Sequence, residues 1–397
     1  MPTADTSLSP DLDWLVTLLW PEAVPAGSQP GPQYGVISRQ GRPKLIVPLD
    51  SPRAAAAAIA RMSGDVGTRA AVVRRLAGYG LRAGAMQPLL RTRWTSAIGG
   101  TPPPVEDYFR AALGVDDIML AVTVGPPRPN RKPVVELLSP NGATIGFAKV
   151  GWNGLTRHLV AREAGVLNGL DRDAMPAIEA PSVLHHGARH ELDILVLSPL
   201  APTPQGHVRR HPTAHEVGQV STLFTAPDQR LERSAYALEL HNRASSRSAA
   251  DGALVARALE LGCRGDRETP MRFAGWHGDW TPWNMMPARG KLLVWDWERA
   301  GGPVPLGFDA VHYFFQSAWL REAASAEAAI DLALDRSADV LAALGVPRVH
   351  RDSIGLLYLS ELFLRYAENA DHGTDQLRGD RHDQVRRALQ QMVADAG

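Results

Sequence analysis

The chain has 397 residues, enough for two or three domains, and its 45% hydrophobic and 21% charged composition excludes a wholly disordered protein. Lysine plus arginine and aspartate plus glutamate both total 42, so the formal net charge is zero and no global field attracts nucleic acid or an anionic membrane. The single cysteine, Cys263, excludes an internal disulfide and a zinc site built from several cysteines.

The N-terminus and the hydropathy predict a cytoplasmic protein. Asp5, Asp11 and Asp13 lie where a secretory signal needs a basic start and an unbroken apolar stretch. No window approaches the roughly 18 apolar residues of a membrane span. We therefore expect no membrane and no nucleic-acid partner, and the oligomeric state stays open.

Residues 1–104 are predicted to form an α/β extension. Two extended segments, Tyr34–Ser38 and Leu45–Val47, flank a short turn and indicate a hairpin. The alanine-rich run Ala54–Met62 is typical of a helix. Three consecutive prolines, Pro102–Pro104, can continue neither a helix nor a central strand and predict a boundary. The segment is open to three roles: a cap on the following part, a substrate-selecting element or a dimer contact.

Residues 105–198 are predicted to form an antiparallel sheet with one helix, at Thr156–Leu170, where apolar residues recur at three- and four-residue intervals. Strands are expected at Ile118–Val124, Val134–Leu138, Thr144–Val150, Ser182–His186 and Ile194–Leu197. The inventory of this part is α+β.

Residues 199–397 are dominated by helical periodicity. Thr213–Glu216 forms an S/T-x-x-E capping box, which predicts a helix start. Strong β signals occur at Phe273–Trp276 and Leu292–Trp295. Helices are expected at 229–245, 252–262, 309–321, 323–343, 352–371 and 381–395.

Between these two strand signals lies the pattern His277-x-Asp279-x-x-x-x-Asn284, and Asp296 follows twelve residues later at the end of the second strand. A lone Asp or Asn in a loop is usually a turn former. The combination of residue types and spacing, however, resembles the catalytic and metal-binding segments of the aminoglycoside phosphotransferase and choline kinase family, relatives of protein kinases. The resemblance implies a bilobal protein-kinase-like fold.

In that fold the antiparallel-sheet N-lobe would span residues 105–198 and the mainly helical C-lobe residues 199–397. Phosphoryl transfer needs a positioned nucleotide, a divalent metal ion and an oriented hydroxyl. The resemblance implies that Asp279 orients the hydroxyl and accepts its proton, and that Asn284 and Asp296 supply the oxygen ligands that Mg²⁺ prefers. His277 would be a structural support.

The fold also requires a lysine on the third strand and a glutamate on the next helix, and Lys149 and Glu163 meet this requirement. An unpaired ammonium in an apolar strand is costly, which favours a functional lysine over a surface lysine on an edge strand. The resemblance implies that Lys149 binds nucleotide phosphate and that Glu163 orients Lys149.

Two further positions are assigned from the resemblance. The stretch Leu195–Leu200, including Ser198 and Leu200, is expected to be the hinge whose backbone meets the adenine ring; a plain interdomain connector is the alternative. Asp309 resembles the family's later structural aspartate, which braces the catalytic segment; a helix N-cap is the alternative.

One segment departs from the family pattern. The expected phosphate loop, residues 125–133, contains several prolines and no G-x-G-x-x-G, so few backbone N–H groups are available to phosphate. Arg128, Arg131 and Lys132 either replace those groups by charge or are simply solvated.

Five tryptophans lie within residues 276–297, and aromatic faces suit a sugar, an amino sugar or an amino alcohol. Trp280 and Trp283, beside Asp279, are the candidates to line the substrate, whereas core packing is the alternative for most of the five, especially Trp295. The C-terminal segment mixes acidic and basic residues, as in salt-bridged helix faces, so a metabolic sugar-like acceptor is favoured over an antibiotic.

The sequence therefore predicts an enzyme, an ATP-dependent and Mg²⁺-dependent small-molecule kinase that phosphorylates a hydroxyl group, with GTP as the other candidate nucleotide. The alternative is a catalytically silent, kinase-like scaffold that binds a nucleotide or metabolite. A protein kinase is disfavoured because D-F-G and A-P-E landmarks are missing.

Overall fold

The computed structural model describes most of the chain, and the following account concerns those residues. They are residues 10–25, 28–39, 42–61, 92–96, 103–125, 130–200, 211–264, 269–288, 290–371 and 379–397. The chain divides into two compact units: Met1–Ala161 with Ser182–Pro199, and Arg162–Pro181 with Leu200–Gly397.

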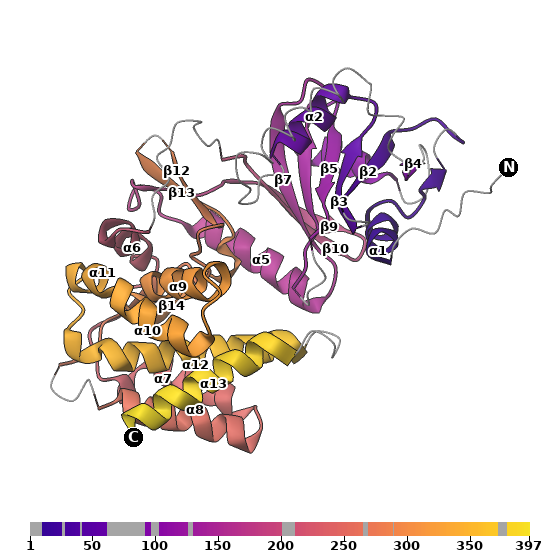
Figure 1. Cartoon of the computed structure of the whole chain (residues 1–397). Helices are drawn as coiled ribbons and strands as arrows, with labels where there is room; N and C mark the ends of the chain where they lie inside the picture. The colour runs from indigo at the N-terminus through magenta and orange to yellow at the C-terminus, as the bar shows by residue number, and fades with distance from the viewer. Residues whose placement is uncertain are drawn as a thin grey trace. The chain divides into compact units, whose positions relative to one another are not determined.

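The first unit is built on a nine-stranded antiparallel sheet in the order β1-β4-β2-β3-β5-β6-β7-β10-β9 (Figure 1). Its strands are β1 (Val24–Pro25), β2 (Gln33–Arg39), β3 (Arg42–Pro48), β4 (Arg93–Thr95), β5 (Met119–Thr123), β6 (Val134–Leu138), β7 (Thr144–Gly151), β9 (Val183–Arg189) and β10 (Leu192–Leu197). The predicted hairpin and all five strands predicted after residue 104 are therefore confirmed.

Both faces of this sheet are covered. Successive side chains of a strand point to opposite faces. In β3, Ile46 packs in one core with α1 (Pro10–Leu19) and α4 (Val105–Leu113), whereas its neighbours Leu45 and Val47 pack in a second core with α2 (Pro52–Arg61). Two buried faces explain why the strands have nearly continuous apolar sequences.

The first hundred residues are part of this sheet. Strand β3 pairs with β5 through Leu45 opposite Thr123 and Ile46 opposite Val122. The predicted boundary at residue 104 marks the start of α4 but does not separate two compact units, because the strand ladder continues across it.

A buried carboxylate ties the N-terminal segment to α4. Glu106 is fully buried, and its Oε1 accepts hydrogen bonds from Trp20 Nε1 at 2.9 Å and from the Tyr34 hydroxyl. Its Oε2 accepts from Ser96 Oγ at 3.2 Å. Burial, followed by the nearby charge of Glu106, raises the pKa of Tyr34. Three donors from the first hundred residues therefore depend on one acceptor in α4.

Replacing Glu106 with alanine should lower the free energy of unfolding by roughly 2–4 kcal/mol, because the buried Trp20, Tyr34 and Ser96 donors lose their acceptor. Urea unfolding followed by tryptophan fluorescence measures this change. Glu106→Gln, which retains one acceptor oxygen, is the matched control and should be less harmful. A loss below about 0.5 kcal/mol for Glu106→Ala would show that this network does not hold the segment.

The second unit is mainly helical and contains the C-terminal part of α5 (Gly154–Gly169) from Arg162 onward. Its helices are α6 (Ala214–Ser221), α7 (Ala235–Ser245), α8 (Ala249–Gly262), α9 (Phe308–Gln316) with the π-helical turn Ser317–Arg321, α10 (Ala326–Arg336), α11 (Ala338–Ala343), α12 (Arg351–Asp371) and α13 (Gly379–Ala396). The capping box is confirmed: the Thr213 side chain accepts from Glu216 N, and the Glu216 side chain accepts from Thr213 N.

Short strands support the loops of the second unit. Strand β11 (Phe273–Trp276) pairs antiparallel with β14 (Gly301–Pro305). Strands β12 (Met285–Ala288) and β13 (Lys291–Val294) form a hairpin, and β8 (Ile178–Glu179) lies parallel to β13. The sequence predicted β11 and β13 but not β8, β12 or β14.

This organisation, an antiparallel-sheet unit and a mainly helical unit, confirms the predicted α+β class. Within the described ranges, no helix combines the length and the apolar character needed to cross a membrane.

Candidate active site

The loop between β11 and β12 carries Asp279, whose carboxylate is held by two side chains. Asn284 Nδ2 donates to Asp279 Oδ2 at 2.8 Å and to the Asp279 carbonyl oxygen at 3.0 Å. His312 Nε2 lies 3.3 Å from Asp279 Oδ1. The Asp279 side chain stays 34% exposed, so a further group can still reach the carboxylate.

The start of this loop is fixed by the buried carboxylate of Asp309, at the beginning of α9. Its Oδ2 accepts from the backbone N–H of His277 at 2.7 Å, and its Oδ1 accepts from that of Gly278 at 3.1 Å. Gly278 has a φ of +78°, and a Cβ there would lie 2.5 Å from the Arg299 carbonyl oxygen. The bracing role predicted for Asp309 therefore matches its contacts.

His277 is fully buried behind the loop, as expected of a structural support. Its Nδ1 accepts from the backbone N–H of Asp279 at 3.2 Å. Burial lowers the pKa of His277 to about 4, although the charges of Asp279 and Asp296 act in the opposite direction. The imidazole is therefore neutral at neutral pH, with its proton on Nε2.

The sequence analysis missed His312, on α9. It is buried, and its Nδ1 lies 2.9 Å from the Tyr358 hydroxyl on α12. When Tyr358 donates to Nδ1, Nε2 carries the proton and can donate to Asp279. Burial lowers the pKa of His312, which favours this neutral form. The only sequence signal was its position three residues after Asp309, on the same side of the helix.

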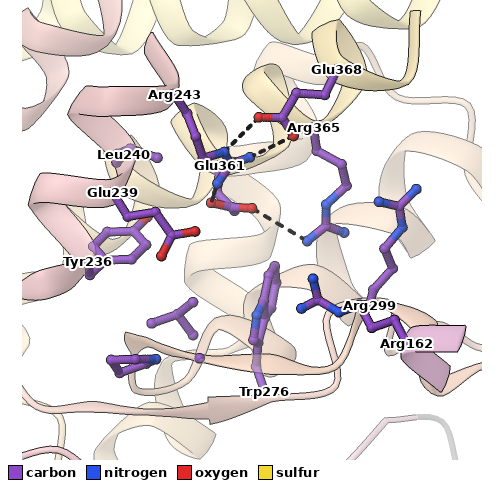
Figure 2. A pocket seen from close by; sticks show the side chains of 13 residues that line it. Arg162, Tyr236, Glu239, Leu240, Arg243, Trp276, Arg299, Glu361, Arg365 and Glu368 are labelled. Carbon is purple, nitrogen blue, oxygen red and sulfur yellow. Dashed lines mark hydrogen bonds and ion pairs between the residues drawn. The ribbon is translucent and has the colours of Figure 1, made fainter. Parts of the chain in front are cut away.

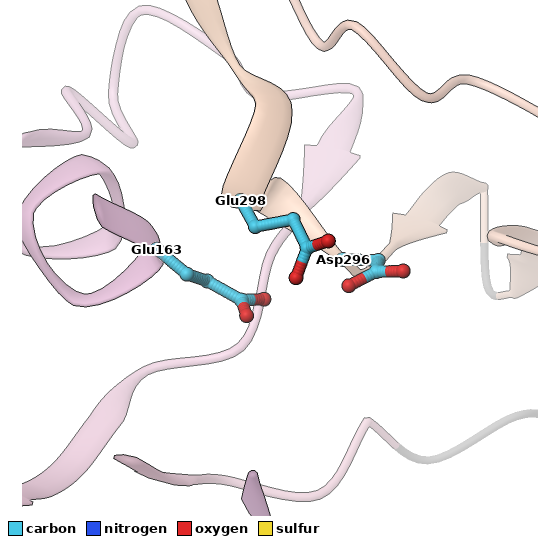
Figure 3. Close-up of side chains that lie close together, drawn as sticks. All are labelled: Glu163, Asp296 and Glu298. Carbon is cyan, nitrogen blue, oxygen red and sulfur yellow. The ribbon is translucent and has the colours of Figure 1, made fainter. Parts of the chain in front are cut away.

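Asp296 follows β13 and adopts a left-handed backbone conformation with a φ of +70°. Its carboxylate lies close to those of Glu163 and Glu298 (Figure 3), and one oxygen from each of the three carboxylates lies within 4.8 Å of the other two. Glu163 Oε1 also accepts from the backbone N–H of Trp297 at 3.1 Å. Glu163, the glutamate predicted on the helix, therefore lies beside Asp296 and binds Trp297, the residue after it.

Asn284 and Asp296 lie at the same end of the β12–β13 hairpin. The Asn284 carbonyl oxygen accepts from the backbone N–H of Trp295, the residue before Asp296, at 3.1 Å. Because the Asn284 amide nitrogen binds Asp279, its side-chain oxygen is the atom left to serve as a ligand. An amide oxygen beside carboxylates is the donor set that suits Mg²⁺, so these residues fit the predicted metal.

The predicted nucleotide residues fall in both units. Lys149 lies on β7, opposite Val134 and Leu195, in the first unit, whereas Glu163 lies in the second, so their pairing stays a prediction. Ser198 lies in the first unit, near the end of its segment Ser182–Pro199. Leu200 is the first residue of the segment Leu200–Gly397 of the second unit. The predicted hinge thus coincides with a passage of the chain between units.

Two predicted positions are placed differently from expectation. Trp280 is fully buried and its Nε1 donates to Met285 Sδ at 2.8 Å, so it is a core residue and does not line a substrate; Trp283 is 42% exposed. In the loop 125–133, Arg131 is largely buried and pairs with Asp11 at 2.9 Å, so it is not a solvated side chain. Arg128 lies outside the described residues.

Asp309 makes stability depend on pH. Burial raises its pKa from 3.8 to about 7, although the His277 and Gly278 N–H groups lower it. Between these two values the native carboxyl keeps its proton while the unfolded one has released it, so stability falls as the pH rises through this range. His277, with its lowered pKa, contributes in the opposite direction.

We expect the free energy of unfolding of the native protein, minus that of Asp309→Asn, to decrease between pH 4 and pH 7, since the variant keeps His277 but lacks the titrating carboxyl. Urea unfolding at a series of pH values measures the difference. A difference that increases with pH over this range would contradict the raised pKa.

No family model and no curated protein matches the chain in sequence. Solved structures do match it. A thermostable mutant of aminoglycoside phosphotransferase APH(4)-Ia, in a ternary complex with ADP and hygromycin B, is 14% identical; the match covers 74% of this chain and 98% of that chain, with a TM-score of 0.48. Amicoumacin kinase in complex with AMP-PNP and Ca²⁺ is 11% identical, covering 69% and 88%, with a TM-score of 0.43.

Proposed function

We propose that this protein is an ATP-dependent phosphotransferase that moves the γ-phosphate to a hydroxyl group of a small molecule. The observation that carries the proposal is the placement of Asp279: its partly exposed carboxylate is oriented by Asn284 and His312, on a loop braced by Asp309. A carboxylate so oriented is suited to general-base catalysis.

In the proposed step, the acceptor hydroxyl oxygen attacks the γ-phosphorus and its proton passes to Asp279. The new O–P bond forms as the bond between the γ-phosphorus and the β–γ bridging oxygen breaks, and ADP leaves. The hydrogen bonds from Asn284 and His312 keep the carboxylate facing the acceptor, which reduces the entropic cost of aligning the reacting atoms.

Asn284 and Asp296 would hold Mg²⁺, which, when bound, would neutralise charge on the nucleotide phosphates. Lys149, oriented by Glu163, would contact a nucleotide phosphate, and the backbone around Ser198 and Leu200 would meet the base. ATP is the preferred nucleotide in this proposal, with GTP as the alternative.

For the acceptor, we propose a sugar, an amino sugar or an amino alcohol. Trp283 offers an exposed indole four residues from Asp279, on which a sugar ring or an amine can stack. Trp280 is buried and therefore does not contribute to this surface.

A catalytically silent scaffold is the second candidate. The observation that favours it is the engagement of Arg131 with Asp11 and the Trp14 ring, which removes one cation from the loop expected to cover the phosphates. The two candidates make opposite predictions for turnover in the presence of an acceptor.

Thermal unfolding with Mg-ATP or Mg-GTP, and ADP or GDP release with a panel of sugars, amino sugars and amino alcohols, test the proposal. The magnesium nucleotide should raise the apparent stability of the native protein.

Asp279→Asn should keep this stabilisation but lose roughly 10²–10⁴-fold in turnover. Asp296→Ala should lose the magnesium-dependent stabilisation. Asp331→Asn, an exposed carboxylate on α10, is the control and should match the native protein. Nucleotide binding without turnover of any acceptor would favour the scaffold.

His312→Phe should lower kcat roughly tenfold while leaving the KM for ATP nearly unchanged, because it removes the donor to Asp279 but not the nucleotide contacts. His312→Gln, which can still donate, should recover part of kcat. Tyr358→Phe removes the donor to Nδ1 that favours a proton on Nε2, so it should lower kcat less than His312→Phe does. A kcat equal to that of the native protein in all three variants would assign His312 a purely structural role.

A further inference from the structure

A charged cavity of about 340 Å³ lies within the second unit, among α7, α12, β14 and the end of β11 (Figure 2). Asp279, Asn284 and Asp296 are not among its lining residues, so it is distinct from the candidate active site. Its charged side chains form a first group of Arg243, Glu361 and Glu368 and a second group of three arginines, and Glu239 on α7 is a further carboxylate in the lining.

In the first group, two carboxylates share one arginine, which leaves one negative charge in excess. Arg243 on α7 lies between two carboxylates of α12, at 2.7 Å from both Glu361 and Glu368. Burial alone would lower the pKa of Arg243, but the two glutamates outweigh this effect and raise it. Arg243 is therefore fully paired in the structure.

The second group consists of Arg162, Arg299 and Arg365, which lie together on the side of the cavity that includes Trp276 (Figure 2). Arg162 donates to the Ala300 carbonyl oxygen at 3.0 Å, and Arg299 donates to Asn369 Oδ1 at 2.9 Å. Both acceptors are neutral. In the part of the chain that the structure describes, neither Arg162 nor Arg299 forms an ion pair.

Arg365 is only weakly compensated. Its guanidinium lies 4.8 Å from the centroid of the Trp276 ring and donates to the Gly278 carbonyl oxygen. Its ion pair with Glu361 is long, at 3.9 Å, and that carboxylate already binds Arg243. The three arginines therefore make this side of the cavity locally positive, and over the whole lining four arginines exceed three glutamates by one charge.

The positive charge of Arg365 acts on both neighbouring arginines. Burial lowers the pKa of Arg162 and of Arg299, and the positive charge of Arg365 is the next largest cause in both. Arg162 is exposed as a residue, so its guanidinium can also be reached from solvent. An anion placed among the three guanidinium groups would remove this repulsion.

We propose that the cavity binds a small phosphate-bearing anion between Arg162, Arg299 and Arg365. Among the described residues, Arg162 and Arg299 bind neutral acceptors and form no ion pair, so their guanidinium groups can bind the charge of about −2 that a phosphate monoester carries at neutral pH. Arginine presents planar pairs of N–H donors that suit phosphate oxygens. The cavity is also larger than a phosphate group alone, so it can accommodate part of an attached organic group. The proposal concerns binding and does not rest on the proposed function.

Isothermal titration calorimetry of the full chain at constant ionic strength tests the site, with inorganic phosphate and glucose 6-phosphate as probes and chloride as the background anion. We expect saturable 1:1 binding of phosphate that persists with saturating Mg-ADP. Arg162→Gln and Arg299→Gln should each weaken it at least tenfold. Arg172→Gln is the matched control, because Arg172 also donates to backbone carbonyl oxygens, those of Ala180 and Pro181, but lies outside the cavity.

The two probes distinguish the source of the phosphate. Tighter binding of glucose 6-phosphate would indicate that a phosphate monoester is the occupant, whereas tighter binding of inorganic phosphate would indicate the free ion. Absence of saturable binding by the native protein would overturn the proposal, as would displacement of phosphate by Mg-ADP or equal weakening in Arg172→Gln. Circular dichroism checks that each variant is folded, and the experiments on the native protein decide the matter if a variant is not.

Discussion

The geometry of the candidate active site depends on one buried carboxylate. Asp309 binds the backbone N–H groups of His277 and Gly278, and the next N–H group, that of Asp279, binds back to His277 Nδ1. The direction of the Asp279 side chain is therefore set by its own backbone and not only by its neighbours. Burial raises the pKa of Asp309 to about 7 although both N–H donors lower it, so the charged form of this group is disfavoured by burial and supported by the two hydrogen bonds.

The elements that could be predicted are those whose formation depends on residues close together in the sequence. The strands from residue 118 to residue 197 were recognised because both faces of their sheet are buried, which produces apolar runs bounded by turn residues. The HxDxxxxN spacing identified Asp279 and Asn284, which lie five residues apart and hydrogen-bond to each other. Strands such as β8 and β14 are short and owe their pairing to distant segments, so no period could reveal them.

The rest of the site depends on contacts between distant residues. His312 reaches Asp279 from 33 positions away, and Tyr358 reaches His312 from 46 positions away. Such packing is set by tertiary structure, which a single sequence does not record. Trp280 illustrates the opposite error: it is adjacent to Asp279 in sequence, but the neighbouring side chain points into the core. Proximity along the chain was a poor guide to which tryptophan faces solvent.

Arg365 connects the catalytic loop with the charged cavity. One guanidinium nitrogen binds the Gly278 carbonyl oxygen, one position before Asp279, while the same side chain lines the cavity and lies on the Trp276 ring. Because a guanidinium has several donors in a fixed plane, an anion bound to its free edge would restrict the side chain without breaking the bond to the loop. Arg365 therefore contributes both to the positive charge of the cavity and to the hydrogen bond that holds the catalytic loop. We expect an anion bound in the cavity to affect the loop through this side chain.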